Sequence, residues 1–460
     1  MRPNSWSFGI YAAVVWRDIQ LITRRFKIYC VAFFVYATYK RAGKKAEKIK
    51  DVKAKAEFWD GVHTRMARYV FQNIVKLEGL WVKLGQFVAT RTDVMPDAWI
   101  AELVALQDCL PVRSWSETRR TIEEEFKIPI EKAFETVDKE PLGTASIAQV
   151  HRAVLHSGQE VVIKVQHRNI DRIITQDLDN TVYLANYLAA KEPKYDFRDI
   201  LTEWCKETVK ELDFEHEASN MERVAANLRK DPNIHVHIPF VVRISGDGGM
   251  PPLHPTKRVL LLEFIDGVKP TDLSGLAKIG VSGRTQCEAI LTNITASFAH
   301  QVFIDGLFNA DPHPGNMLIQ RNSHTPVLID FGLTKEIPEK QRLAFARLLI
   351  AAADYDMTGV LGAMREMGLE NVSLDHPEDA MDAVHYMFRD AQPTIDQRRT
   401  AIERRSQHAA IPNSAAPDAP SSLRASAPSL AIPELLTQFN FGSPCQRMQT
   451  RFTVLHGAPS

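Results

Sequence analysis

Two aspartates and an asparagine at fixed spacing constrain this chain more than any other feature. Asn316 follows Asp311 by five residues, and Asp330 comes fourteen residues after Asn316, at the end of the apolar run 327–329. Magnesium prefers hard oxygen ligands and is usually held by one or two carboxylates together with phosphate oxygens. The three side chains therefore predict a site for magnesium and a polyphosphate, in a fold that brings these segments together.

The order of these residues is that of a kinase. A catalytic Asp, a metal-binding Asn and a strand ending in Asp-Phe-Gly follow one another in protein kinases. By that order Asp311 lies where an attacking hydroxyl or water approaches, and Asn316 and Asp330 are the metal ligands. His313, between two prolines, is interpreted as a structural residue of this loop, because no second His or Cys stands at ligand spacing.

An upstream lysine fits the same chemistry. Lys164 ends the run Val-Val-Ile-Lys, as the phosphate-pairing lysine of a kinase does. A charge in an apolar strand needs a partner, and the best candidate is Glu217, on a helix predicted over 200–230. The alternative is an ordinary lysine on an edge strand.

The nucleotide-binding elements are predicted from position. The segment 142–150 occupies the place of a glycine-rich loop, although only one of its residues is glycine, and small residues still allow backbone N–H groups to approach phosphate. Glu263 and Ile265 end the apolar strand 258–264, where a hinge would offer backbone groups to adenine. The residues predicted for the loop are Leu142, Gly143, Thr144, Ala145, Ser146, Ile147, Ala148, Gln149 and Val150.

Two features differ from an ordinary protein kinase. No Ala-Pro-Glu follows Asp330, and a helix predicted over 338–367 leaves little room for a peptide-binding segment. More than 140 residues precede the loop, and they include Lys83-Leu84-Gly85-Gln86.

With these motifs the chain resembles the UbiB/ADCK family of atypical kinases, from about residue 58 to 389. Lys83, Gly85 and Gln86 resemble the family's K-x-G-Q motif, and Glu211 and Asp213 its E-x-D motif. The segment around 77–86 is most similar to a plant and algal branch, in which a β-lactamase-like domain follows. No such domain is expected in the 460 residues here.

The resemblance implies an α+β, two-lobed kinase-like fold with a helical extension capping the active site. It implies that Lys83 pairs with Glu211 over the site and, with Gln86, regulates it. Asp213 is either a second carboxylate beside the metal or an ion-pair partner. The expected organisation is a leader (1–57), the extension (58–140), an N-lobe (141–265), a C-lobe (266–397) and a disordered tail (398–460) rich in Ala, Ser and Pro.

The activity implied is that of an ATPase or a kinase of small molecules or lipids, with ATP or ADP and Mg²⁺ as cofactors. The family's role is in isoprenoid-quinone and prenyl-lipid metabolism. The alternative is a catalytically weak, nucleotide-switched lipid-binding protein or chaperone. Phosphorylation of peptides would require the Lys83 helix to move aside.

The net charge of zero hides an asymmetry. The chain has 56 basic and 56 acidic residues, but residues 1–46 contain nine bases and one acid. The zero net charge of the whole chain argues against a generally basic nucleic-acid binder.

The two apolar runs of the leader, 5–16 and 28–39, are each too short to span a bilayer. They predict an interfacial membrane helix, an organelle transit peptide or a helix docked on the body. The expected location is a mitochondrial or plastid membrane, with no prediction of oligomeric state.

Overall fold

The computed structural model describes residues 5–90, 95–107, 112–193, 196–246, 251–354 and 356–368. The described residues fall into two compact units, one within the ranges 1–298 and 309–335 and the other within 299–308 and 336–368. The predicted tail (398–460) and the last part of the predicted C-lobe lie outside the described residues. All of the predicted site residues belong to the first unit.

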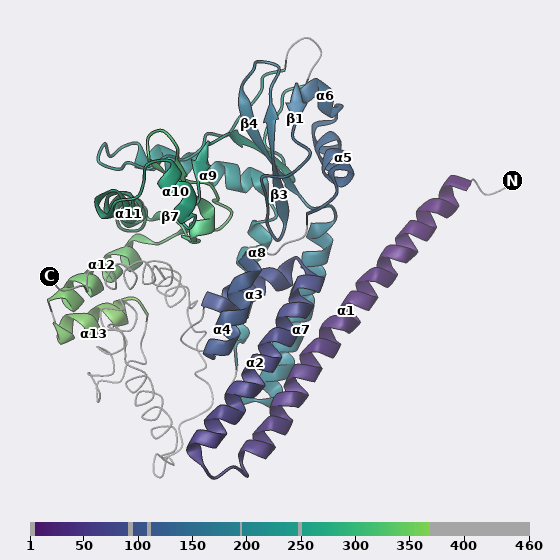
Figure 1. The fold of residues 1–460 in the computed structure, drawn as a ribbon, viewed down its shortest axis with the longest axis vertical. Helices are drawn as coiled ribbons and strands as arrows, with labels where there is room; N and C mark the ends of the chain where they lie inside the picture. The colour runs from purple at the N-terminus through teal and green to yellow at the C-terminus, as the bar shows by residue number, and fades with distance from the viewer. Residues whose placement is uncertain are drawn as a thin grey trace. The chain divides into compact units, whose positions relative to one another are not determined.

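The first unit begins with a group of helices (Figure 1). The second of them packs on both the first and the fourth, and its buried Val62, Met66 and Ile74 give it an apolar seam. The helices are α1 (Ser5–Ala46), α2 (Val52–Leu77), α3 (Leu80–Thr90), α4 (Asp97–Leu103) and the 3₁₀ turn η1 (Val104–Gln107).

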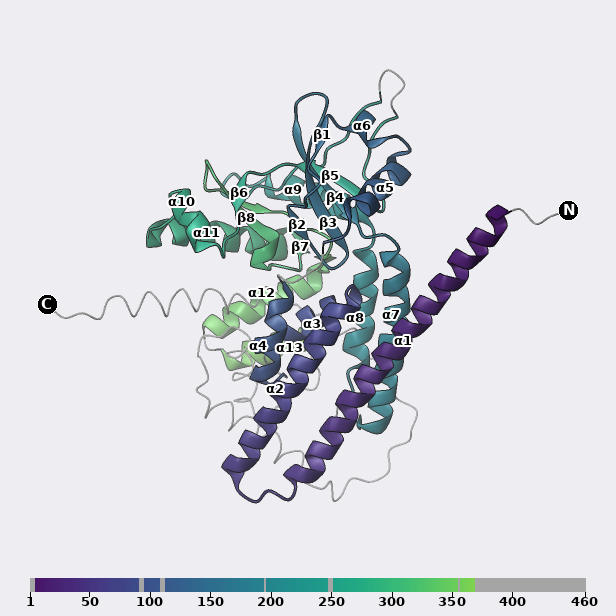
Figure 2. The ribbon, with the colours of Figure 1, turned by 45° about the vertical axis from the view of Figure 1, so that its right-hand side comes forward.

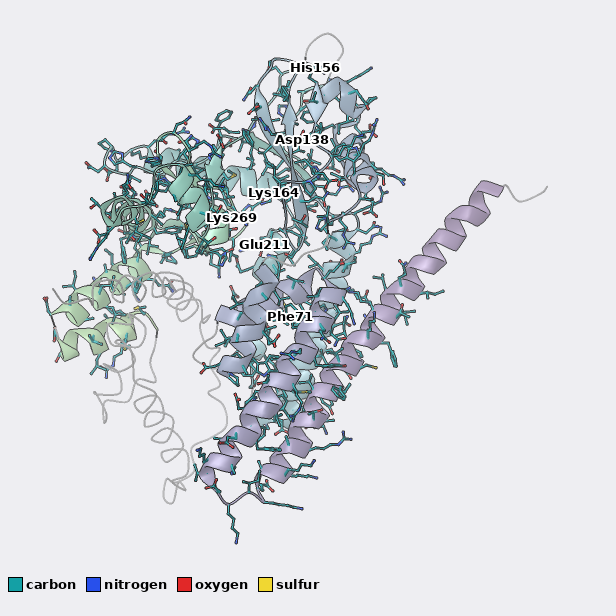
Figure 3. All side chains as sticks on the ribbon, in the orientation of Figure 1. Phe71, Asp138, His156, Lys164, Glu211 and Lys269 are labelled. Carbon is teal, nitrogen blue, oxygen red and sulfur yellow. The ribbon has the colours of Figure 1, made fainter. Side chains whose placement is uncertain are left out.

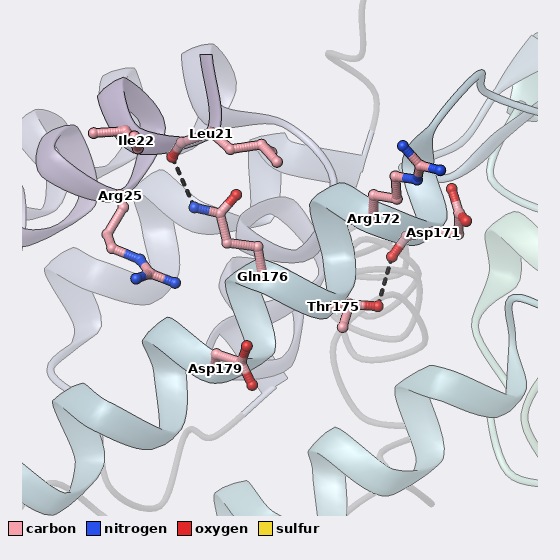
Figure 4. Close-up of a pocket in the computed structure, with 8 residues that line it drawn as sticks. All are labelled: Leu21, Ile22, Arg25, Asp171, Arg172, Thr175, Gln176 and Asp179. Atoms are coloured by element: carbon pink, nitrogen blue, oxygen red, sulfur yellow. Dashed lines mark hydrogen bonds between the residues drawn. The ribbon is translucent and has the colours of Figure 1, made fainter. Parts of the chain in front are cut away.

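The leader forms one continuous helix rather than two separate runs. Helix α1 has 42 residues and lies antiparallel to α2 (Figures 1 and 2). It also packs on α7 (Ile170–Lys191), where the Gln176 side chain donates a hydrogen bond to the Leu21 carbonyl at 2.7 Å, beside an open groove of about 520 Å³ (Figure 4). Among the helices of the described residues, none contains a stretch with both the length and the hydropathy of a membrane span.

A five-stranded antiparallel sheet follows, with strand order β1-β3-β4-β5 and β2 paired to β3. Along β4, Val161, Ile163 and Val165 pack in one apolar core with α5 and α6. Because side chains alternate along a strand, Lys164 points to the opposite face of the sheet. The elements are α5 (Trp115–Phe126), α6 (Ile130–Ala133), β1 (Thr136–Val137), β2 (Gly143–Thr144), β3 (Ala148–Val154), β4 (Glu160–Gln166) and β5 (Val259–Glu263).

The single helix predicted over 200–230 is wrong, since two helices stand there. Helix α8 (Arg198–Lys210) ends before Glu211, and α9 (Phe214–Leu228) begins after Asp213. The Asp213 carboxylate accepts hydrogen bonds from the backbone N–H groups of Glu215 and His216. Such an N-cap satisfies donors at the helix start and ends the preceding helix at this point.

The turn between α2 and α3 has an unusual backbone. Glu78 has φ 55° and ψ −169°, and Gly79 follows with φ 56°. Glycine adopts the conformation of Glu78 readily, whereas another residue pays about 1–3 kcal/mol for it. The surrounding contacts must therefore hold Glu78 in place.

The rest of the first unit contains a second, three-stranded sheet of order β6-β8-β9. The antiparallel register pairs Met317 with Leu328, which brings the residue before β8 close to those after β9. These elements are β6 (Gly267–Val268), α10 (Leu273–Lys278), α11 (Arg284–Ala299), η4 (Pro314–Asn316), β8 (Met317–Gln320) and β9 (Pro326–Leu328).

In the second unit, the helix predicted over 338–367 is divided in two. Helix α12 packs on α13 and on the π-helix η3, where Phe303 stacks on Phe345. The elements are η3 (His300–Asp305), α12 (Glu339–Ala353) and α13 (Met357–Glu366), and the short strands β7 (Leu307–Asn309) and β10 (Thr334–Glu336) lie at the boundaries of the units.

Candidate active site

A buried lysine lies at the centre of the site. Lys164 Nζ, on β4, is 2.6 Å from Glu217 Oε1, on α9, and their side chains are 11% and 2% exposed. The ring of Phe214, at the start of α9, lies 5.2 Å from the same ammonium. Lys164 is thus a paired interior residue of the sheet, bounded by β3 and β5, and not an edge-strand lysine.

The same lysine contacts the aspartate that follows β9. Asp330 Oδ2 is 3.0 Å from Lys164 Nζ, and Asp330 Oδ1 accepts the N–H of Gly332 at 3.0 Å. Phe331 is fully buried, and its carbonyl accepts a hydrogen bond from the Asn220 amide. The backbone on both sides of Asp330 is therefore fixed, and one ammonium joins the two carboxylates.

Asp311 and Asn316 contact each other. Asn316 Nδ2 donates to Asp311 Oδ2 at 2.7 Å, and Asn316 accepts the N–H of Ile329 through its backbone carbonyl at 3.0 Å. This second bond continues the β8–β9 pairing and brings Asn316 beside the residue that precedes Asp330. Asp311, Asn316 and the segment that ends in Asp330 thus come together.

Charge and burial shift the pKa values of these groups. Burial would lower the pKa of Lys164, but Asp330 and Glu217 outweigh it and raise that pKa. Burial would raise the pKa of Asp330, but Lys164 and the Gly332 N–H hold it below its usual value. Burial, followed by the charge of Asp330, raises the pKa of Asp311. One carboxylate is thus kept ionised, and the other is better able to accept a proton.

Helix α3 brings a second lysine to the site. Lys83 forms an ion pair with Glu211, at the end of α8, and both side chains are less than a fifth exposed. Burial lowers the pKa of Lys83 to about 8, although Asp330 and Asp311 act in the opposite direction. Figure 3 labels Glu211 near the helices and Lys164 on the sheet. A Cβ on Gly332 would lie 3.7 Å from Glu211, so this pair lies beside the Asp-Phe-Gly segment.

The side chains of the other two residues predicted to be regulatory make other contacts. Gln86 donates to the Leu106 carbonyl of η1 at 3.3 Å, so its side chain links α3 to η1. The Asp213 carboxylate caps α9.

The predicted nucleotide loop is a tight β2–β3 hairpin. Gly143 and Thr144 pair with Val150 and Gln149, and Ala145 donates its N–H to the Ala148 carbonyl. A Cβ on Gly143 would meet nothing within 4 Å, which leaves room beside the backbone. The remaining loop residues, from Leu142 to Ile147, range from exposed (Leu142) to buried (Ser146 and Ile147).

Two predicted contact residues point their side chains away from the loop and the hinge. Gln149 is 1% exposed, and its amide donates to Thr118 and contacts His151, each at 2.8 Å. Glu263 Oε2 is 2.8 Å from His237 Nε2. At these two positions only the backbone is available to contact a nucleotide. The third predicted contact residue, Ile265, is buried.

The donor set fits a magnesium ion bound with a polyphosphate. Asn316 uses its amide nitrogen for Asp311, which leaves the Asn316 carbonyl oxygen for a cation. Asp330 has one hydrogen bond to each carboxylate oxygen and retains lone pairs on both. Mg²⁺ bound together with substrate phosphates usually takes one or two carboxylates from the protein, and the Asp330 carboxylate and the Asn316 carbonyl oxygen could fill this role.

Three side chains that fix the backbone of the site, those of Asn309, Asn220 and Phe214, were not predicted from the sequence. Asn309 donates to the Asp330 carbonyl at 2.7 Å and accepts the Asp311 N–H at 2.8 Å, so it links the two aspartates. Asn220 holds the Phe331 carbonyl, and Phe214 lies against Lys164. One sequence feature could have indicated Asn309. It is a polar residue next to an apolar run, and a buried amide needs hydrogen-bond partners.

Fold and site define a kinase-like protein of mixed α and β structure, as predicted. Residues 105–364 match the family model described as the ABC1 atypical kinase-like domain, which covers more than half of the chain. The chain therefore belongs to the ABC1 (UbiB) family of atypical kinases.

Relatives from fungi, animals and plants are similar to the chain. An ABC1 family protein of Schizosaccharomyces pombe is 31% identical, over 78% of this chain and 64% of its own length. AarF domain-containing protein kinase 1 of Mus musculus is 32% identical, over 67% and 56%. The chloroplastic protein ACTIVITY OF BC1 COMPLEX KINASE 8 of Arabidopsis thaliana is 32% identical, over 66% and 39%. The chain thus spans less than two thirds of the length of each.

The buried ion pair predicts strong coupling between its members. We expect Glu217→Gln to reduce the free energy of unfolding by about 2–4 kcal/mol, because it leaves the Lys164 charge with Asp330 as its remaining partner. Adding Lys164→Met removes that charge, so the double variant should lose clearly less than the sum of the single losses. Urea unfolding of the four proteins measures this cycle. Additivity within about 0.5 kcal/mol would show that the pair is not coupled.

Proposed function

We propose that the chain binds MgATP or MgADP around Lys164 and transfers a phosphoryl group from ATP to water or to a small-molecule or lipid acceptor. The observation that carries this proposal is that Lys164 contacts both Glu217 (2.6 Å) and Asp330 (3.0 Å). Active kinases require their strand lysine, its glutamate partner and the metal aspartate in place together.

Each residue has a distinct role in the proposed reaction. Lys164 pairs with the phosphates and is held by Glu217, and Asn316 and Asp330 bind Mg²⁺. Bound Mg²⁺ would neutralise phosphate charge. Asp311, whose pKa burial and Asp330 raise, accepts the proton of the attacking hydroxyl. The backbone of 142–150 covers the phosphates, and that of Glu263 and Ile265 faces adenine.

A second candidate function rests on the position of Lys83. The charges of Asp330 and Asp311 act on the pKa of its ammonium, and Glu211 forms an ion pair with it. A helix fixed at the site in this way would suit a nucleotide-switched lipid-binding protein or chaperone that turns over slowly. In either case we propose that residues 58–140 form a capping extension and that Lys83 restricts access.

The proposed partner is an anionic membrane surface, and the proposed setting is an organelle membrane that supplies prenyl lipids such as quinone precursors. One face of α1 supports this. Exposed Ile19, Ile22, Phe26 and Phe33 follow one another along it, whereas Ile28 on the opposite face is buried. The exposed cations Lys40, Arg41, Lys44 and Lys45 continue the helix. Apolar residues next to cations are typical of helices that lie in a membrane interface.

Phosphate release from purified protein decides between the two functions. We expect Asp330→Asn and Asp311→Asn each to reduce ATP turnover at least about 100-fold, since each removes a group on which phosphoryl transfer depends. Arg284→Met, which removes an exposed ion pair on α11, is the matched control. If the wild type binds ATP but turns over no faster than Asp330→Asn, the switch and not the enzyme is the correct function.

Sedimentation with vesicles tests the proposed partner. Replacing Ile22 and Phe26 by serine removes two exposed apolar side chains, so binding to vesicles with anionic lipid should fall by about tenfold or more. Leu291→Ser, at an exposed position of α11, should bind as the wild type does. Equal binding of the two variants would exclude this face of α1 as the membrane contact.

A further inference from the structure

The glutamate at the α2–α3 turn occupies a backbone conformation suited to glycine. Glu78 has φ 55° and ψ −169°, and its neighbour in the turn is a glycine. A strained residue persists only where its surroundings hold it, and such residues gather at positions with a specific task. We therefore expect the side chain of Glu78 to have a specific structural task.

That side chain forms an ion pair with Arg113. Their side chains are about one third exposed, and Arg113 lies just before α5, in a different part of the extension. The turn is also held from the other side, because Arg24 of α1 donates to the Leu77 carbonyl at 2.5 Å and to Asp177 of α7 at 2.9 Å. Asp177 is fully buried, so this anchor is fixed.

Arg113 is in turn bound to the strand that leaves the nucleotide loop. The Arg113 N–H donates to Gln149 Oε1 at 3.0 Å, and the Gln149 amide lies 3.4 Å from the Arg113 carbonyl. Gln149 pairs with Thr144 across the β2–β3 hairpin. Its amide nitrogen is held further by Thr118 and His151, both almost fully buried. A movement of the β2–β3 hairpin would therefore move Arg113.

On its other side, the turn determines where Lys83 lies. The Lys83 N–H donates to the Gly79 carbonyl at 3.4 Å in the first turn of α3. A change at Glu78 and Gly79 would therefore displace the start of α3 and the Lys83 side chain with it. The chain of contacts runs from Gln149 through Arg113 and Glu78 to Lys83.

We propose that Arg113 is a positioning residue that couples the 142–150 hairpin to Lys83 through its ion pair with Glu78. A nucleotide that moves the hairpin would thereby move the α3 lysine relative to Asp311 and Asp330. The ligand-driven part of this inference rests on the proposed nucleotide function. The positioning of Lys83 by Arg113 does not, and it can be tested without ligand.

Lysine acetylation read by mass spectrometry tests the positioning. Without nucleotide, Lys83 should react slowly in the wild type, relative to the exposed Lys53. In Arg113→Met and in Glu78→Gln its rate should rise by up to about fivefold, since a partly exposed ion pair is worth up to about 1 kcal/mol. Arg284→Met should leave the rate unchanged. Unchanged Lys83 reactivity in both Arg113→Met and Glu78→Gln would overturn the proposal.

A glycine variant separates the ion pair from the backbone strain. Glu78→Gly suits the turn but removes the carboxylate, so it should raise Lys83 reactivity as Glu78→Gln does, with no loss of unfolding free energy. If Glu78→Gly protects Lys83 as well as the wild type does, the turn alone positions the helix and Arg113 does not.

Hydrogen exchange with MgADP tests the coupling. In the wild type, nucleotide should slow exchange at 143–150 and alter it at 79–84. In Arg113→Met the effect at 143–150 should remain and that at 79–84 should be lost. An effect at 79–84 that survives in Arg113→Met overturns the coupling. If the wild type shows no effect at 143–150 at saturating MgADP, the proposed nucleotide function fails, whereas acetylation still reports on the positioning.

Discussion

The buried ammonium of Lys164 is the interaction on which the rest of the site depends. It comes from the middle of a sheet, and its two carboxylate partners come from α9 and from the segment after β9, 53 and 166 residues away along the chain. An isolated charge at this depth would cost several kcal/mol, so the sheet can keep Lys164 only if both segments are in place. The fold of the first unit is thus tied to the assembly of the site.

Around that ammonium, charge is distributed unevenly. Lys164 keeps Asp330 ionised, and Asp330 in turn raises the pKa of Asp311. The second lysine, Lys83, lies close enough to respond to both aspartates but is bound to Glu211. A polyphosphate with its metal would meet two cations and two carboxylates, which suits the mixed charge of that ligand. Membership of the ABC1 family is consistent with this chemistry.

The sequence predicted the pairs that depend on motif order. Matching an ordered set of motifs was enough to pair Lys164 with Glu217 and Lys83 with Glu211. It also placed Asp311 near Asn316 and Asp330. It did not predict the break at Asp213, because a helical pattern of apolar residues continues through it and the cap depends on one carboxylate. Nor did it show that Gln149 turns inward to Arg113, since a polar residue beside a predicted phosphate loop looks like a ligand contact. Side-chain direction follows from burial, which spacing alone does not determine.

A crystal structure of the protein with Mg²⁺ and a non-hydrolysable ATP analogue would test the proposed roles of Lys164 and of the two metal-binding residues. We expect Asp330 and the carbonyl oxygen of Asn316 to coordinate the metal. We also expect Lys164 to keep its contact with Glu217 while it reaches the phosphates. A nucleotide bound with its phosphates away from Lys164, or a metal with neither Asp330 nor Asn316 among its ligands, would show that these roles are wrong.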